Sequence, residues 1–270
     1  MKKGLAVLIL VSLLVLAIVS GCIQQTQQPT KSSILSALDS INAYTYELSE
    51  KRLIQNRTTY NIYGVVGIDR KSLQFFESIK TTIGNDTFKL WQYFDGSYVY
   101  FKVEDSKRNS TGTGKIPIEE IYKNMSKYSK NINREEFIER TIKTRNALAH
   151  LRKILENATI TSIEKDGALY KITFKLVRYY EKAPTFLNTN AENSEAIRDY
   201  INTLRRNVKE NITGIVWVNN ESLPLKFEIK KHTIETYLIT NITVEGYVEY
   251  NVTVTYKYQL PEWVYEVEKK

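Results

Sequence analysis

The last part of the chain alternates between apolar and polar side chains at every second position. Large apolar residues fall on even numbers at Ile234, Leu238, Ile242, Val244, Val248, Tyr250, Val252, Val254, Tyr256, Tyr258 and Leu260. A period of two is typical of a β-strand with one buried face. Because one straight strand of this length is implausible, we expect a turn or kink at Val244–Tyr247. The pattern predicts an antiparallel sheet with one packed face and one wet face.

Much of the remaining chain repeats the strand pattern between turn signals. An N-terminal meander is predicted from strands at residues 44–48, 59–69, 72–83, 87–94 and 97–104. The pair Asp95–Gly96 within it favours a tight hairpin turn. Two further pairs of strands are predicted at residues 159–164 with 168–180, and 211–218 with 223–231. The segment SKRNSTGTGK, at residues 106–115, is predicted to be a flexible loop.

Helical spacing of apolar residues occurs in three places. Residues 33–43 have an amphipathic pattern, and Pro117 fits the start of a second helical stretch. Asn133 followed by Glu136 resembles a capping box, and the apolar stripe behind it predicts one helix that reaches Asn157. A third helix is predicted from the apolar face formed by Ile197, Ile201, Leu204 and Val208.

The order of these elements is helix, meander, helices, two strands, helix and strands. Because no βαβ alternation occurs, the predicted fold class is α+β. We expect a curved antiparallel sheet, or half-open barrel, covered on its concave side by helices. Residues 33–270 are enough for a single domain with a substantial core.

The first residues have the layout of a secretory signal. Lys2 and Lys3 precede an apolar run from Leu5 to Val19, which Ser12 alone interrupts. At about 1.5 Å per residue this run makes roughly 22 Å, short of the roughly 30 Å hydrocarbon core of a bilayer. Residues 1–21 are therefore predicted to be a signal peptide.

The only cysteine of the chain follows this segment directly. Val19-Ser20-Gly21-Cys22 resembles a lipobox, the cleavage and lipidation site of prokaryotic lipoproteins. The resemblance implies a thioether from the Cys22 sulfur to a membrane lipid, with cleavage before Cys22. Residues 22–32, which have almost no large apolar side chain, are predicted to be a flexible tether. The alternatives are an uncleaved signal anchor and a chance cysteine in an ordinary signal.

Asparagine occurs unusually often in the N-x-S/T context of glycosylation. The nine candidates are Asn56, Asn85, Asn109, Asn124, Asn157, Asn211, Asn220, Asn241 and Asn251. A glycan is bulky and hydrophilic, so a real acceptor must face solvent in an exported chain. The alternative explanation is a strand composition rich in threonine and asparagine, which creates the motif without modification. A lipobox together with many such motifs suggests an archaeal cell surface, with the chain on the extracytoplasmic side of the cell membrane.

The patterns expected of an enzyme or a nucleic-acid-binding protein are missing from the sequence. Nothing pairs His150 with His232 into a metal site, and no G-x-S-x-G, H-E-x-x-H, P-loop or G-x-G-x-x-G motif is present. The formal net charge of +8 includes Lys2 and Lys3 and is spread without a run of five like charges. A dispersed charge disfavours a nucleic-acid partner. We therefore expect no catalytic residue, no metal, no cofactor and no nucleic acid.

Three segments resemble the LolA-like lipoprotein-sorting proteins. WQYFDGSYVYFKVE (91–104) looks like their Asp-Gly hairpin followed by an aromatic strand, and GIVWVNNESLPLKFEIKK (214–231) looks like their hairpin with a V-W-I-D turn and an L-P-L-K strand start. ILSALDSINAYTYELSEKRL (34–53) matches their opening helix and first strand. The resemblance spans roughly residues 34–260 and includes no catalytic residue. It implies a half-open barrel with helices inside its mouth, which known members use to hold acyl chains or a partner protein.

Aromatic residues are the candidates for lining a groove between sheet and helices. The candidates are Trp91, Tyr93, Tyr98, Tyr100, Trp217 and Tyr250, with Phe101 and Trp263 as further members. Their alternative role is the sheet–helix core itself. The leading hypothesis is a membrane-anchored, non-catalytic module that binds a lipid or other apolar ligand by apolar burial. The second hypothesis is a surface interaction or structural lipoprotein that binds another protein or the cell-surface layer. A hydrolase or transferase is the third.

Overall fold

The computed structural model describes residues 28–54, 57–126, 133–182 and 204–268. Its strands are β1 (Ala43–Ile54), β2 (Arg57–Asp69), β3 (Gln74–Ile83), β4 (Asp86–Phe94), β5 (Tyr98–Asp105), β6 (Ser110–Pro117), β7 (Thr159–Asp166), β8 (Leu169–Lys182), β9 (Arg206–Val218), β10 (Pro224–Tyr237) and β11 (Thr243–Thr255). The helices are α2 (Lys31–Ser40), α3 (Ile118–Ser126), α4 (Arg134–Arg145), α5 (Ala147–Asn157) and α7 (Glu262–Glu268).

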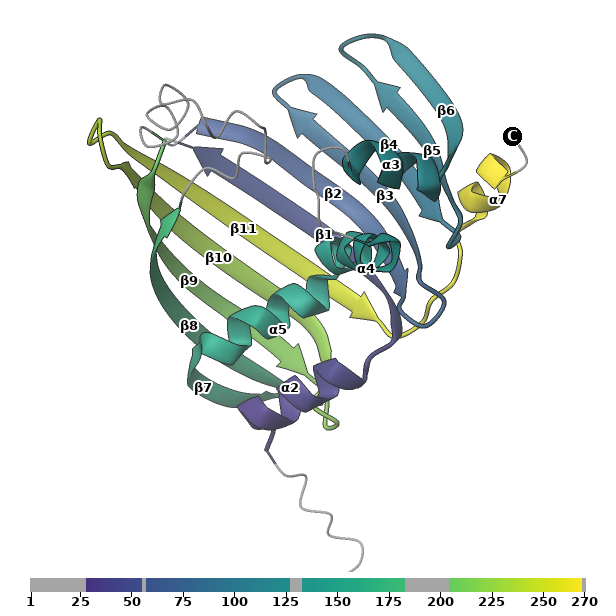
Figure 1. Cartoon of the computed structure of the whole chain (residues 1–270). Helices are drawn as coiled ribbons and strands as arrows, with labels where there is room; N and C mark the ends of the chain where they lie inside the picture. The colour runs from purple at the N-terminus through teal and green to yellow at the C-terminus, as the bar shows by residue number, and fades with distance from the viewer. Residues whose placement is uncertain (1–27, 55–56, 127–132, 183–203, 269–270) are drawn as a thin grey trace, which may run out of the picture.

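All eleven strands form one antiparallel sheet that stays open. Their order is β6-β5-β4-β3-β2-β1-β11-β10-β9-β8-β7, so the first and last strands of the chain meet in the middle of the sheet. The edge strands β6 and β7 do not pair with each other. The sheet is curved, and α2, α3, α4 and α5 lie on its concave face (Figure 1). The predicted α+β half-open barrel with helices on its concave side is confirmed.

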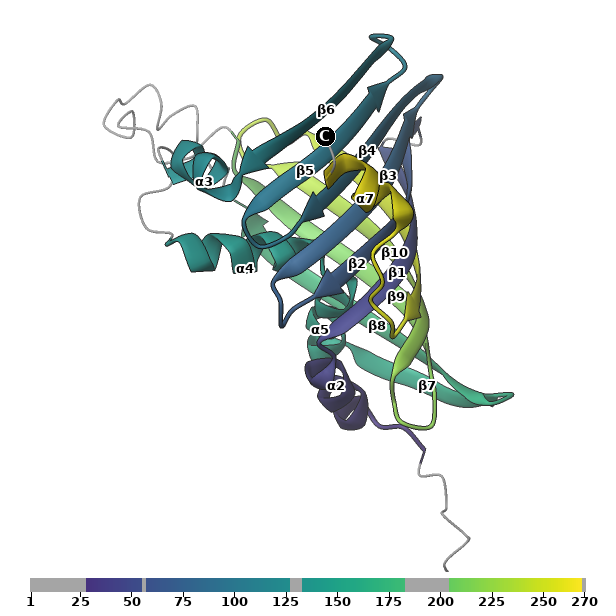
Figure 2. The same cartoon turned by 90° about the vertical axis from the view of Figure 1, so that its right-hand side faces the viewer.

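The two faces of the sheet carry different side chains. On the concave face, alternate residues such as Tyr44, Tyr46 and Val252 are buried beneath the helices in the main core. On the opposite face, which we call the convex face, a smaller cluster forms where Val264 of α7 packs against the sheet. Figure 2 shows α7 against β3–β5, with α2–α5 on the other side of the sheet. Sequence reasoning did not predict α7.

Helix α2 begins at Lys31, two residues before the predicted start. Thr30 caps it, because its hydroxyl accepts from Ser33 N at 3.1 Å while the Ser33 hydroxyl accepts from Thr30 N at 2.9 Å. The Lys31 ammonium donates to the carbonyls of Glu156 and Ala158 at 2.8 and 2.9 Å, and so satisfies the C-terminal end of α5. The start of the folded domain is thereby fixed to α5.

The predicted single helix from Asn133 to Asn157 is in fact two helices. Asn133 caps α4 as predicted, since its side chain accepts from Glu136 N at 2.8 Å. The correction concerns Asn146, which ends α4 and caps α5 by accepting from Ala149 N at 2.7 Å. A side chain that satisfies a new helix start favours a break in the chain direction. α5 therefore takes its own course across the sheet (Figure 1).

The segment predicted as a flexible loop contains the edge strand β6. Residues 110–117 pair with β5 along their whole length. Glycine is depleted in strands, which is why Gly112 and Gly114 favoured a loop. Gly114 has a packing role, because a Cβ there would lie 2.5 Å from the ring of Phe101. Only residues 106–109 of the segment, a turn that ends at Asn109 with a φ of 47°, remain outside the strand.

The long C-terminal alternation breaks earlier than predicted. The turn lies at residues 238–242, before the expected Val244–Tyr247. Across this hairpin Phe227 faces Val252, so buried positions are odd in β10 and even in β11. Ile234 consequently lies on the convex face, opposite to the side that its even number predicts. The number of residues in a turn, which the alternation alone does not reveal, sets this parity.

The predicted third helix is corrected at its C-terminal end. Val208 lies in β9 and is buried on the concave face, and Leu204 lies in a turn. Pairing with both β8 and β10 from Arg206 onward overrides the helical spacing there. Ile197 and Ile201 lie outside the described residues, as do Cys22 and the predicted signal peptide. In the described ranges, no helix is both long and apolar enough to cross a bilayer.

Candidate functional site

The helices leave part of the concave face uncovered. α5 buries Leu148, Leu151 and Leu155 in the core. Beside it, between the helices and the sheet, lies a cavity of about 690 Å³, which we call the concave cavity. It is lined by Tyr46, Glu50, Arg52, Arg140, Lys143, Thr144, Arg145, Asn146, Ala147, Ala149, His150, Lys153, Ile154, Arg178, Ile212, Ile229, Lys231, Val248 and Tyr250.

The floor of the concave cavity changes from apolar to charged along the strands. Residues two apart share a face of a strand, so Ile229 is followed on the floor by Lys231, and buried Leu176 is followed by Arg178. A smaller cavity of about 260 Å³ adjoins the first and shares Lys231 and Val248 with it. The concave face therefore presents an elongated amphipathic surface.

Two tyrosines hold the helical wall of the concave cavity in place. Tyr44 of β1 donates from its hydroxyl to Asn146 Oδ1 at 2.7 Å. The hydroxyl of Tyr46, two residues further along the same face, donates to the carbonyl of Arg145. The junction of α4 and α5 is thus fixed to the middle strand of the sheet. The basic C-terminal end of α4 is therefore held in place at the cavity without a ligand.

Arg145 also joins α4 to the neighbouring strands. Its guanidinium donates from Nε and Nη2 to the two carboxylate oxygens of Glu77, both at 3.1 Å, and from Nη2 to Gln92 Oε1 at 3.1 Å. It lies 4.4 Å above the ring of Phe75. A forked pair of this kind has defined geometry. Glu77 is 7% exposed, so Arg145 provides hydrogen bonds that water would otherwise give to its carboxylate.

Replacing Glu77 by alanine is expected to lower the free energy of unfolding by about 3 kcal/mol, because Arg145 then keeps a largely enclosed charge without its carboxylate. Arg140→Ala is the matched control, since the exposed pair Arg140–Glu136 within α4 contributes only about 0.5 kcal/mol or less. Urea unfolding of both variants provides the measurement. Equal losses for the two would contradict the structural role given to the Arg145–Glu77 pair.

Positive charge exceeds negative charge around the concave cavity. The lining cations are Arg52, Arg140, Lys143, Arg145, Lys153, Arg178 and Lys231, and the one lining carboxylate is Glu50. Three further carboxylates, which do not line the cavity, form ion pairs with some of these cations. They are Glu77, Glu136 and Glu210. The described part of the chain therefore places seven cations against four carboxylates here.

The pKa of His150 is lowered at this wall. His150 lies on α5 at the cavity wall, with its ring edge-on to Tyr250 at a centroid distance of 6.1 Å. Desolvation by the surrounding protein, followed by the charges of Lys231 and Arg178, holds the pKa of His150 below its ordinary value of 6.5. Desolvation is the largest cause and the two cations add to it, so a positive charge on His150 is unfavourable at this wall.

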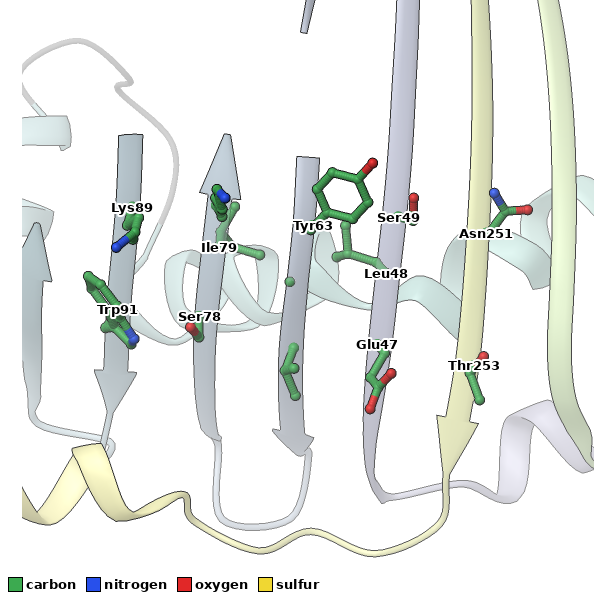
Figure 3. Close-up of a pocket in the computed structure, with 13 residues that line it drawn as sticks. Glu47, Leu48, Ser49, Tyr63, Ser78, Ile79, Lys89, Trp91, Asn251 and Thr253 are labelled. Carbon is green, nitrogen blue, oxygen red and sulfur yellow. The ribbon is translucent and has the colours of Figure 1, made fainter. Parts of the chain in front are cut away.

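A second, open groove of about 510 Å³ lies on the convex face. Figure 3 shows Tyr63, Trp91, Asn251 and Thr253 on the near side of the strands, with the helices behind the sheet. The ammonium groups of Lys102 and Lys89 lie 4.6 and 5.8 Å from the centre of a Trp91 ring. These contacts with cations occupy the exposed face of the indole.

The predicted aromatic residues divide between the two faces. Of the six main candidates, only Tyr250 lines the concave cavity. The expectation that all six line a groove between sheet and helices is corrected for five, which lie on the convex face: Trp91, Tyr93, Tyr98, Tyr100 and Trp217. In each strand the residue next to them in sequence, such as Phe94 or Val218, takes the buried concave position. Aromatic content alone does not reveal whether the odd-numbered or the even-numbered residues of a strand face the concave side.

The two further aromatic candidates also lie apart from the concave cavity. Trp263 belongs to α7 and packs in the smaller convex cluster. Phe101 lies in β5, where its ring covers Gly114 of β6. Sequence reasoning missed the cations of the cavity. Their signal is weak because they are distributed over α4, α5 and three strands and form no run of like charges.

Most of the predicted glycosylation sites face solvent. The exposed asparagines are Asn85, Asn109, Asn124, Asn157, Asn220, Asn241 and Asn251. Asn211 in β9 is half-buried, and Asn56 lies outside the described residues. Asn251 lines the convex groove, so a glycan there would occupy the groove. Within the described ranges, no group of three or more histidine, cysteine or acidic residues is arranged to hold a metal ion.

The fold and the cavity define an open antiparallel half-barrel with a basic, amphipathic cavity on its concave face. No family model matches the chain, and no curated protein matches it. Three solved structures are similar in outline. They are a DUF1329 family protein from Desulfovibrio piger, a LolA superfamily protein from Nitrosomonas europaea, and a β-barrel-like protein with a domain of unknown function from Brucella abortus.

The similarity to these structures is distant. The Desulfovibrio protein has 9% identity and a TM-score of 0.29, with 90% of this chain and 99% of that chain covered. The Nitrosomonas protein has 9% identity and a TM-score of 0.20, with 90% of this chain and 100% of that chain covered. The Brucella protein has 8% identity and a TM-score of 0.20, with 80% of this chain and 98% of that chain covered. At such scores the function has to be argued from the residues of this chain.

Proposed function

We propose that the protein is a membrane-tethered, extracytoplasmic binding module that holds a lipid or similar amphipathic ligand in its concave cavity, without covalent chemistry. The single observation that supports this most is the cavity of about 690 Å³ between helices and sheet. Small-molecule sites commonly have volumes of roughly 300–1,000 Å³ and combine apolar walls with a few polar groups. Ile212, Ile229 and Val248 supply apolar walls here.

The concave cavity suits this role better than the convex groove. Its wall is fixed by the hydroxyls of Tyr44 and Tyr46, so little ordering is required when a ligand binds. The convex groove lies on an open sheet face and has no helical wall, and one of its lining residues, Asn251, is a candidate glycosylation site. A glycan on Asn251 would compete with any ligand in that groove.

The proposed anchor is a lipid on Cys22, with the domain on the extracytoplasmic side of the membrane. Gln28 already contacts the fold, since its side-chain amide donates to the carbonyl of Ile163 at 3.2 Å. The six residue steps from Cys22 to Gln28 span at most about 22 Å at the usual reach of roughly 3.3–3.6 Å per residue. The proposal therefore keeps the half-barrel close to the membrane surface, where lipids are available. The solvent-facing sequons are proposed to carry glycans there.

A tryptophan placed in the concave cavity is expected to abolish ligand retention. Val248 is half-buried on the cavity floor, so the indole of Val248→Trp would extend into the open space. Native mass spectrometry of the chain without residues 1–21 is expected to show a co-purifying amphiphile in the parent protein, and about tenfold less of it or none in this variant, a loss of roughly 1.4 kcal/mol or more in binding.

Val65→Trp is the matched control for this experiment. Val65 is also a strand valine, but it lines the convex groove. The Val65→Trp variant should co-purify with the same amount of ligand as the parent protein. Loss of ligand in Val65→Trp with retention in Val248→Trp would transfer the site to the convex face, and absence of any ligand in the parent protein would favour the second candidate function. That function is a surface lipoprotein that binds another protein, and the exposed Tyr63 and Val65 of the convex groove are the observation in its favour.

A further inference from the structure

We propose that the ligand of the concave cavity is an amphiphile with an anionic headgroup, and that the headgroup binds at the α4–α5 wall beside His150. This inference rests on the proposed function and specifies its ligand class. Amphiphiles with a phosphate monoester or carboxylate head fit this description. Three features of the cavity support this ligand class: the positions of the cations, their partial neutralisation, and the apolar surface next to them.

The cations converge on the cavity from separate elements. Lys143 comes from α4 and Lys153 from α5, while Arg178 and Lys231 come from β8 and β10. The fold therefore brings together residues that are up to 88 positions apart in the chain. Arginine and lysine are the residues that bind phosphate and carboxylate groups most strongly, through charge-assisted hydrogen bonds.

These cations are only partly neutralised by the protein. Arg178 and Lys231 share one carboxylate, that of Glu210, at 2.7 and 3.4 Å. In the described part of the chain, neither Lys143 nor Lys153 forms an ion pair. The Nε of Arg178 is buried and has no acceptor among the described residues. The Oε2 of Glu210, 2.7 Å from Arg178 Nη2, likewise has no hydrogen-bond donor among these residues, so the charge left for an anionic headgroup is that of Lys143 and Lys153.

Apolar surface lies directly beside the charged wall. Tyr250 and Ile229 line the same cavity, and Val248 continues the floor into the adjoining cavity of about 260 Å³. That second cavity also has charged lining residues, among them Arg52, Lys182 and Glu235, so the apolar surface for a tail is that of the concave cavity itself. A ligand with its head at His150 would have apolar surface for a tail along the floor, whereas a free anion would leave that surface uncovered.

Binding of four probes distinguishes the head from the tail. The probes are dodecyl phosphate, dodecyl phosphocholine and dodecyl maltoside, which share a C12 tail, and inorganic phosphate, which has none. Calorimetric titration of the chain without residues 1–21, below each micelle concentration, is expected to show dodecyl phosphate binding at least about tenfold more tightly than dodecyl maltoside. The difference should shrink as salt rises, since salt screens charges that solvent reaches.

Lys143→Glu with Lys153→Glu is the variant for this test. Both side chains are exposed and unpaired among the described residues, so the double variant should keep its fold. It should lose the preference for dodecyl phosphate while its affinity for dodecyl maltoside stays the same. Arg108→Glu with Lys107→Glu, on the exposed β5–β6 turn, is the charge-matched control and should change neither affinity.

The outcomes separate this inference from the proposed function. Equal affinity for all three C12 probes would overturn the anionic headgroup and leave the amphiphile module intact. Binding of inorganic phosphate as tightly as dodecyl phosphate would show that the tail contributes nothing, and would overturn the proposed function. Absence of binding by every probe would overturn both.

The two histidines provide a readout that needs no variant. His150 faces Glu50 of β1, Arg178 of β8, Lys231 of β10 and Lys153 of its own helix, so a bound anion there should raise its pKa. His232 lies on the convex face, 3.2 Å from Glu245, and is the internal control. NMR titration with dodecyl phosphate should raise the pKa of His150 alone. An unchanged pKa of His150 in a saturated complex would contradict the placement of the head.

Discussion

Cys22→Ser is expected to move the protein from the membrane fraction into the soluble fraction. A hydroxyl cannot form the thioether that the proposed anchor requires. A lipid with two acyl chains holds a protein stably, at about 0.8 kcal/mol for each buried methylene, so removal of the anchor should change membrane retention almost completely. Fractionation of expressing cells, with intact-mass analysis of the membrane-bound parent protein, provides the measurement.

Thr26→Ala is the control for Cys22→Ser, because it changes the tether without touching the sulfur. It should remain in the membrane fraction with a lipid-sized mass increase on the mature chain. Membrane retention of Cys22→Ser at full chain length would instead identify an uncleaved signal anchor. An unmodified Cys22 in the parent protein would remove the lipid anchor from the account.

Leu151→Ala is expected to lower the free energy of unfolding by about 4 kcal/mol. Leu151 lies in the middle of α5, has no exposed surface, and packs in the core between α5 and the sheet. Truncation of a fully buried leucine costs roughly 2–5 kcal/mol, because the lost apolar contacts add to the cavity left behind. Since α5 also carries His150, the variant should weaken the wall of the concave cavity as well.

Leu238→Ala is the matched control for Leu151→Ala. Leu238 is 45% exposed in the β10–β11 turn, so its truncation should change the free energy of unfolding by about 0.5 kcal/mol or less. Chemical unfolding followed by far-ultraviolet circular dichroism measures both. A loss below about 1 kcal/mol for Leu151→Ala would mean that α5 is not held on the sheet by this core.

The sheet and the main helices could be predicted because their signals are local and repeated. Alternation marks β1–β5 and β11, and Asn133 marks the start of α4 through its cap. Asn146 carries the same kind of cap signal, but it falls inside an apolar stripe that suits one long helix. β6 was missed because its glycines lower strand propensity, while its pairing with β5 supplies the stability.

The candidate site was harder to predict than the fold. Which parity of a strand faces inward depends on the turns, and so five of the six aromatic candidates lie on the convex face. The cations of the concave cavity, such as Lys143, Arg178 and Lys231, look like ordinary solvated residues in the sequence. Only the strand order, which places β8 and β10 opposite the α4–α5 junction, brings them together.

The most direct test of the central claim is to locate a bound acyl chain within the protein. A dodecyl phosphate with a spin label on its tail broadens NMR signals of nearby groups, and the labelled compound can be titrated into the chain without residues 1–21. The account predicts broadening of the ring signals of His150 and Tyr250 in the concave cavity, with the indole signal of Trp91 unchanged. Broadening of Trp91 alone, or of none of the three, would contradict it.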